Sequence, residues 1–187
     1  MDLYPSFYKQ IVERANKAFP SARSVANAQW DHLISPYEIE LPQSIYDKAS
    51  AAIKALYGLT RRKSFQSALD TEGKFPFSVK NDSVLMAYDF HTDEEGGAHL
   101  VEINTNAAGY LLSAVMNCNH RNQDVLASEE IRALHDSFVQ EGLKPGMSVG
   151  ISDDDIDAQK MLLEFVMYRD LFTHWKCHPS LAEARSF

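Results

Sequence analysis

The segment that most constrains the fold is residues 83–109, where two apolar stretches flank a turn that contains two glycines. Residues 83–91 read Ser-Val-Leu-Met-Ala-Tyr-Asp-Phe-His, and residues 98–104 read Ala-His-Leu-Val-Glu-Ile-Asn. The turn-rich segment Thr92–Gly97 separates them. Two such runs joined by a short glycine-containing turn are typical of an antiparallel β-hairpin. The sequence therefore predicts a hairpin over residues 83–106.

The second predicted strand carries polar side chains at alternate positions. Glu102, Asn104 and Asn106 alternate with apolar or β-branched residues, and alternate residues of a strand share one face. A carboxylate and two amides in register on a buried strand indicate a ligand, because unpaired polar groups are costly to bury. The alternative is a half-exposed strand whose polar face meets water. The pattern alone favours neither interpretation.

The neighbouring strand adds a second carboxylate. Asp89 and His91 lie on one of its faces, and if that face opposes Glu102, two carboxylates converge. Paired carboxylates repel each other unless a cation lies between them. Carboxylate and amide oxygens are the ligands that Mg²⁺ prefers. The hairpin therefore predicts a site for a divalent cation.

The rest of the chain alternates helical patterns with turns. Apolar residues recur at helical spacing in four segments before residue 147: from Phe7 to Phe19, from Pro42 to about residue 60, from Tyr110 to Met116, and from Ser128 to Glu141. Gly142 is the expected C-terminal stop of the last of these helices.

A new unit is predicted to begin at residue 147. Met147–Ser152 is a short strand, and the acidic turn Asp153–Asp155 leads into a helix that ends near Trp175. We expect the acidic side chains to cap that helix. Beyond it, residues 176–187 are interpreted as a polar tail, with no second strand for this sheet.

The expected fold is α+β to α/β. It has N-terminal helices, a central mixed sheet that contains the hairpin, and a C-terminal βα unit. The net charge of −8 argues against nucleic acid or an anionic membrane as the main partner. No apolar run is long enough to span a bilayer, and the N-terminus lacks a signal-peptide pattern, so a cytoplasmic protein is expected.

Two motifs carry a resemblance to a known family. Tyr88-Asp-Phe-His91 and Val101-Glu-Ile-Asn-Thr-Asn106, separated by a variable turn, resemble the front half of glutathione synthetase-like ATP-grasp ligases. Relatives of this kind include glutathionylspermidine synthase-like proteins with a permuted ATP-grasp fold. The resemblance covers about residues 83–175. It implies a partial ATP-grasp fold with residues 1–146 in the ATP-grasp-like portion and 147–187 as an incomplete substrate-binding unit.

The resemblance also implies roles for individual residues. Glu102 and Asn104 match the family's ligands of the Mg²⁺ that is held with ATP, and Asp89 matches an aspartate near the substrate. Gln159 matches the glutamine of an N-x-x-x-Q segment that contacts substrate, although Asp155 stands where the family has asparagine. Asn106, next to these ligands, is a further candidate for binding substrate.

The implied activity is ATP-dependent formation of an amide bond from a carboxylate and an amine, through an acyl phosphate. The substrates expected are a thiol peptide or an amine, with Mg²⁺ and ATP as cofactors. We expect little activity from these 187 residues alone. The protein partner expected is a second copy of the chain, in a homodimer, or a complementing polypeptide. The alternative function is a non-catalytic module of the same fold that binds a small molecule or a partner.

Overall fold

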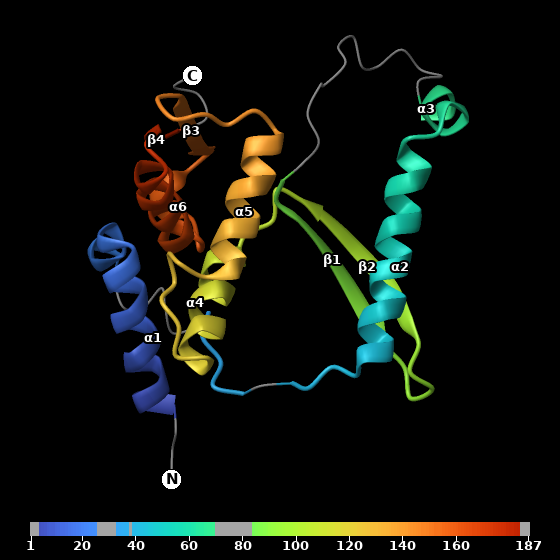
Figure 1. Ribbon diagram of the computed structural model, residues 1–187, viewed down its shortest axis with the longest axis horizontal. Coiled ribbons are helices and arrows are strands. Elements are labelled where there is room, and N and C mark those ends of the chain that lie inside the picture. Colours follow the sequence, from blue (N-terminus) through green and yellow to red (C-terminus); the bar gives the residue numbers. More distant parts are fainter. Residues whose placement is uncertain (1–3, 26–32, 38, 70–83, 184–187) are drawn as a thin grey trace. The chain divides into compact units, whose positions relative to one another are not determined.

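The computed structural model describes residues 4–25, 33–37, 39–69 and 84–183. Along these ranges, helices come first, the two strands of a hairpin follow, and further helices and two more strands complete the chain (Figure 1). The contacts of the chain divide it into two compact units: unit 1 comprises residues 1–38 and 108–187, and unit 2 comprises residues 39–107. In sequence, unit 2 is therefore inserted between two segments of unit 1.

Unit 1 is built mainly from helices: α1 (Tyr4–Ala18), the 3-10 helix η1 (Pro20–Ser24), α4 (Tyr110–His120), α5 (Glu129–Gln140) and α6 (Leu162–His174). Helix α1 packs on α4, and α6 packs on both η1 and α4. Side chains of these helices, with Phe19 between α1 and η1, are among the least exposed of the described residues: Ile11, Phe19, Leu111, Val115, Cys118, Ile131, Leu163, Met167 and Leu171. The helical patterns predicted before Phe19 and after Tyr110 and Ser128 are thus confirmed.

Local hydrogen bonds define where these helices begin and how they are tied together. Ser128 is the N-cap of α5, and its side chain accepts a hydrogen bond from the backbone N–H of Ile131 at 3.3 Å. Gly142 follows α5 with a φ of 101°, as the predicted helix stop requires. Asp170 of α6 accepts two hydrogen bonds of 2.6 Å from Ser21, one from its backbone N–H and one from its hydroxyl.

The C-terminal part of unit 1 is a complete βαβ element. Strand β3 (Ser148–Asp153) pairs in parallel with β4 (His178–Glu183), and α6 connects them while contacting both. The prediction that no second strand follows the helix is therefore wrong. Cys177 is buried, with 5% of its surface exposed, so this segment is not a polar tail. Pro179 weakens the strand signal of β4, because proline is confined to edges and ends of sheets.

The start of α6 also differs from expectation. The acidic turn was expected to cap this helix, but the 3-10 helix η4 (Ile156–Ala158) intervenes and α6 begins at Leu162. The N-cap residue is Met161, which makes no side-chain capping bond. The acidic residues bond locally instead, as when Asp153 Oδ1 accepts from the next backbone N–H at 2.7 Å.

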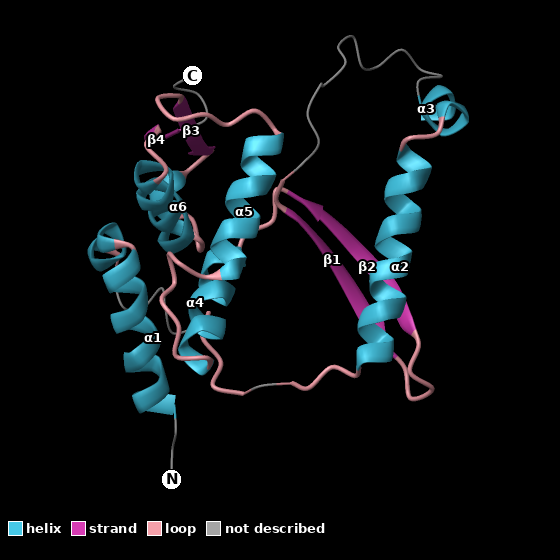
Figure 2. Cartoon of the chain, viewed as in Figure 1, coloured by secondary structure: helices cyan, strands magenta, loops and turns pink. Residues whose placement is uncertain are grey.

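Unit 2 consists of two helices and the hairpin. Helices α2 (Gln43–Thr60) and α3 (Lys63–Leu69) precede strands β1 (Met86–Thr92) and β2 (Ala98–Thr105), which pair antiparallel as predicted. Helix α2 contacts both strands (Figure 2). Among the apolar side chains of unit 2 that the structure describes, Ile45 alone is buried. The hairpin strands are thus mostly exposed, in agreement with the alternative of a strand that meets water.

The fold is a mixture of α and β structure, as predicted, but the described strands form two separate two-stranded sheets rather than one central sheet. The compact units also follow a different division from the predicted boundary after residue 146. Residues on both sides of that position belong to unit 1, because α4 and α6 share one core. None of the described helices is long and apolar enough to cross a membrane.

Candidate functional site

Three of the predicted site residues gather on the hairpin of unit 2. Asp89 and Glu102 are directly opposite each other in the register of β1 and β2, so their side chains project from the same face. The amide nitrogen of Asn104 donates to Asp89 Oδ2 at 3.5 Å. Both carboxylates are exposed and Asn104 is half-buried. The structure therefore brings together the carboxylates and the amide that the alternation predicted.

An irregularity in the strand pairing lies next to this cluster. Asp89 pairs with Glu102, whereas the next residue, Phe90, pairs with Leu100, so that Val101 falls between the two pairs. Such β-bulges bend the strand and change the direction of neighbouring side chains, and they are over-represented next to active sites. Strict alternation in the sequence gives no sign of the bulge.

Asn106 does not continue the alternation of β2. The strand ends at Thr105, and Asn106 has a φ of 64°, in the left-handed region that asparagine tolerates better than most residues. The backbone N–H of Ala107 then donates to the carbonyl oxygen of Leu85 at 2.6 Å, which keeps the chain beside the start of β1. The expectation that Asn106 shares a face with Glu102 by strand geometry is therefore wrong.

Gln159 belongs to unit 1. It follows η4, is half-buried, and its backbone carbonyl accepts from the N–H of Leu162 at 3.1 Å, just before α6 begins. The predicted site residues are thus divided between the two units, with Gln159 in unit 1 and the other four in unit 2.

The described residues contain no group of three or more His, Cys, Asp or Glu side chains that could hold a metal ion. The hairpin offers two carboxylates and one amide oxygen. This set suits Mg²⁺, which proteins usually bind through one or two carboxylates while waters and substrate phosphates supply the other ligands. The donor chemistry of Asp89, Glu102 and Asn104 therefore fits Mg²⁺ bound together with a nucleotide, rather than a metal ion held by protein groups alone.

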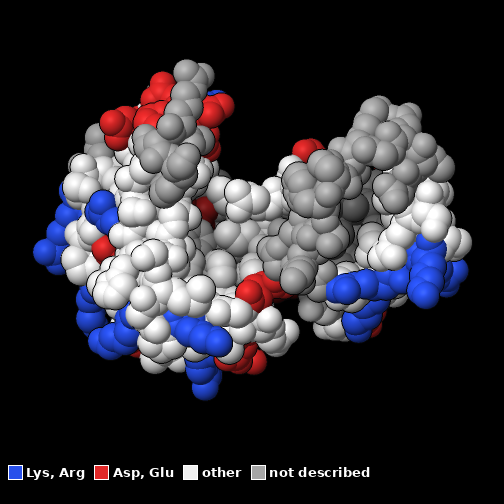
Figure 3. All heavy atoms as spheres, turned by 90° about the horizontal axis from the view of Figure 1, so that it is seen from above, with Lys and Arg blue, Asp and Glu red and all other residues white. Residues whose placement is uncertain are grey.

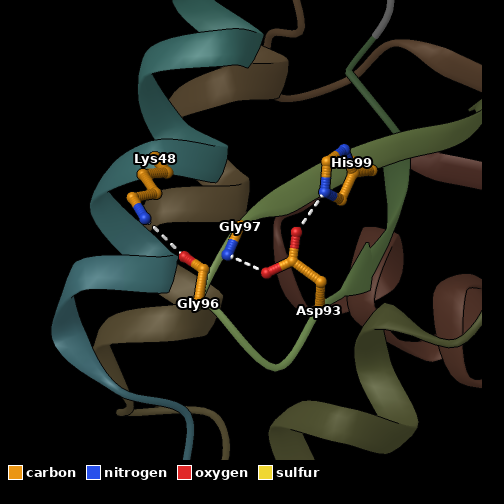
Figure 4. A network of polar contacts seen from close by, with 5 residues as sticks. All are labelled: Lys48, Asp93, Gly96, Gly97 and His99. Carbon is orange, nitrogen blue, oxygen red and sulfur yellow. Dashed lines mark hydrogen bonds and ion pairs between the residues drawn. The ribbon is translucent and has the colours of Figure 1, made fainter.

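The turn between β1 and β2 is held by a small polar network (Figure 4). Asp93 Oδ1 accepts from the N–H of Gly97 at 2.5 Å, and its Oδ2 lies 2.6 Å from Nε2 of His99. The contact with His99 has the larger effect, and together these two bonds lower the pKa of Asp93 below its ordinary value. Lys48 of α2 donates to the carbonyl oxygen of Gly96. The sequence predicts a turn here, and the structure shows that side chains hold this turn in place.

A buried carboxylate that the sequence analysis missed lies in unit 1. Glu164 of α6 is 1% exposed and accepts hydrogen bonds from the N–H groups of Gly109 and, at 2.7 Å, Leu111. It caps α4, whose N-cap residue is a glycine without a side chain. Burial raises the pKa of Glu164, and the backbone hydrogen bonds oppose this. The sequence feature that could have revealed this residue is the position of a glutamate within the apolar run 161–167.

Acidic side chains gather at one end of the face of unit 1 that Figure 3 shows, away from most of its lysines and arginines. In sequence, Asp153 is the last residue of β3, and Asp154, Asp155 and Asp157 follow it closely. Their hydrogen bonds are local, and no metal-binding group is found among the described residues. We assign no site to this acidic segment.

No protein-family model, no curated protein and no solved structure matches this chain. The functional interpretation therefore depends on the geometry of the hairpin and on the chemistry of its side chains.

Proposed function

We propose that the hairpin supplies part of the Mg²⁺–ATP site of a glutathione synthetase-like ATP-grasp ligase, which joins a carboxylate to an amine. The observation that carries this proposal is the direct opposition of Asp89 and Glu102, with Asn104 hydrogen-bonded to the first. Mg²⁺ in such a site neutralises phosphate charge during phosphoryl transfer.

The electrostatics of the pair support a cation. Like charges directly opposite each other in an antiparallel sheet are destabilising, and unit 2 has little buried apolar surface among its described residues to offset this. A divalent cation between Asp89 and Glu102 would turn the repulsion into attraction. The pair is exposed, so water and substrate phosphates can complete the coordination.

Within this proposal, Glu102 and Asn104 are the metal ligands. Asn104 directs its amide nitrogen to Asp89, which leaves its amide oxygen to coordinate the ion. Asp89 orients Asn104 and lies beside the position of the substrate. Asn106, just after the end of β2, is proposed to contact substrate.

Isothermal titration calorimetry with ATP tests the proposal. We expect the chain to bind ATP in the presence of Mg²⁺ and not in the presence of EDTA. Glu102→Gln should weaken this binding by about tenfold or more, because it removes a charged ligand. Glu94→Gln, which makes the same change in the exposed turn of the same hairpin, should leave it unaltered. Equal affinities in the two variants, or binding that is independent of Mg²⁺, would contradict the proposal.

The second candidate is a binding module without ligase activity. Two facing carboxylates are also suited to a protonated amine, which needs no metal and no nucleotide. Spermidine and glutathione, titrated separately in EDTA, distinguish this function. Saturable binding of either probe that is lost in Glu102→Gln, together with no response to Mg²⁺ and ATP, would favour the module over the ligase.

A further inference from the structure

Unit 1 contains a cavity of about 640 Å³ that the proposed function does not use. One wall is a face of α1, and the other is the segment that follows α4. Ala18, Val125 and Leu126 form its apolar part, and amide and charged side chains form the remainder. This volume lies within the range of about 300–1,000 Å³ that is typical of small-molecule sites, while most of the lining residues are polar or charged.

Arg14 of α1 joins the two walls. Its Nε donates to Asn119 Oδ1 and its Nη2 to Asn122 Oδ1, both at 3.3 Å. Its Nη1 donates to the backbone carbonyl of Gln123. Asn122 has a φ of 50°, so the segment turns sharply at the position where Arg14 holds it. The polar wall is therefore fixed by three hydrogen bonds to one guanidinium group.

These bonds determine which polar atoms remain for a ligand. A guanidinium group has only donors, so the amide oxygens of Asn119 and Asn122 must face Arg14. The amide nitrogen of Asn119 then donates to Gln10 Oε1 at 3.3 Å, which orients the amide of Gln10 as well. The amide nitrogens of Asn122 and Gln10 retain their N–H donors. These two amides thus have donors left for a ligand rich in acceptors.

The lining carries two cationic side chains, Arg14 and Lys17, and two acidic ones, Glu13 and Asp124. Lys17 lies three residues after Arg14 on α1, and none of the described residues forms an ion pair with it. Arg14 is bonded to neutral oxygens, so its positive charge is not compensated by these contacts. Of the two acids in the lining, Glu13 lies 3.8 Å from Lys9, and Asp124 accepts from a backbone N–H at 3.2 Å.

We propose that this cavity binds a small molecule with an oxyanion group, either a carboxylate or a phosphate. Lys17 supplies the charge, and the amide N–H groups of Gln10 and Asn122 bind the oxygens. The apolar part of the cavity receives the body of the ligand. This site lies in unit 1 and is independent of the hairpin and of the function proposed for it.

An NMR titration of the full chain tests the site. Inorganic phosphate and succinate are added separately, with sodium chloride keeping the ionic strength constant. We expect saturable shifts of the side-chain amide signals of Gln10 and Asn122 with at least one of the two probes. The probe that binds more tightly identifies the oxyanion as a phosphate or as a carboxylate.

Two lysine variants distinguish a specific site from general attraction of anions. Lys17→Gln should raise the dissociation constant by about tenfold, because it removes a charged donor. Lys54→Gln, which removes the same charge from an exposed position of α2 outside the lining of the cavity, should leave the dissociation constant unchanged. Shifts that do not saturate, or an equal effect of the two variants, would overturn the proposal.

Discussion

At the scale of single residues, Asp89 and Glu102 place like charges at directly opposed positions of an exposed hairpin. Without a cation this arrangement lowers the stability of the pairing, whereas a bound cation makes the same two groups favourable. The sign of their contribution to stability therefore depends on whether a ligand is present.

Asp89→Asn should reveal this change of sign. In EDTA we expect the variant to be more stable than wild type by roughly 0.2–1 kcal/mol, because the cross-strand repulsion is removed. With saturating Mg²⁺ and ATP the order should reverse, because the ligand stabilises the wild-type fold and binds the variant weakly. Urea denaturation under both conditions measures the two differences. A variant that is less stable in EDTA would contradict repulsion between these carboxylates.

The contacts of Asp93 with Gly97 and His99 in the hairpin turn give a second prediction about single residues. A Cβ atom on Gly97 would overlap Asp93 Oδ2 and lie 2.8 Å from His99 Nε2, so Gly97→Ala should separate these side chains and destabilise the hairpin by about 1 kcal/mol or more. Gly58→Ala is the matched control, because Gly58 is inside α2 with no atom within 4 Å of a new Cβ. It should stabilise the chain by up to about 1 kcal/mol. Thermal denaturation measures both, and destabilisation by both or by neither would contradict this account of Gly97.

At the scale of elements, the helices and the hairpin could be predicted from periodicity, since α1, α2, α5 and both strands of the hairpin carry clear patterns. Strand β4 could not, because Pro179 and alternating small or polar residues mask it, and only its parallel pairing with β3 makes it a strand. The sequence likewise did not indicate that Glu164 caps α4. It joins residues more than fifty positions apart, and local sequence rules for helix ends do not reach so far.

The link that Glu164 makes between α6 and α4 gives a prediction about how stability depends on pH. Its pKa is raised above the ordinary 4.5, so the folded state binds the proton more tightly than the unfolded state does. Its contribution to stability is then fully present below about pH 4.5 and is lost as the pH rises through the raised pKa. Glu164→Gln cannot ionise.

The difference in unfolding free energy between wild type and Glu164→Gln should therefore move in favour of the variant between about pH 4 and about pH 8. Urea denaturation at a series of pH values measures the trend. Because the other groups titrate in both proteins, their effects largely cancel in the difference. A difference that is constant with pH, or that moves toward wild type, would show that the pKa of Glu164 is not raised.

At the scale of the whole molecule, the sequence predicted the mixture of helices and strands but not the division into units. Residues 39–107 form a unit inserted into another, because the first helix packs with helices that follow residue 108. Such long-range packing leaves no local signal. The alternation in β2 predicted the cluster of Asp89, Glu102 and Asn104. The departure of Asn106 from that strand depends on its left-handed backbone, which the alternation did not indicate.

The central claim is that Glu102 and Asn104, beside Asp89, hold a metal ion together with a nucleotide, and the position of that ion can be measured directly. Mn²⁺ prefers the same oxygen ligands as Mg²⁺ and broadens the NMR signals of nearby nuclei. On addition of Mn²⁺ with ATP, we expect the backbone amide signals of residues 87–91 and 101–105 to broaden first. They should remain sharp in Glu102→Gln. Broadening that begins instead at residues 153–157, or that is the same in the variant, would contradict the claim.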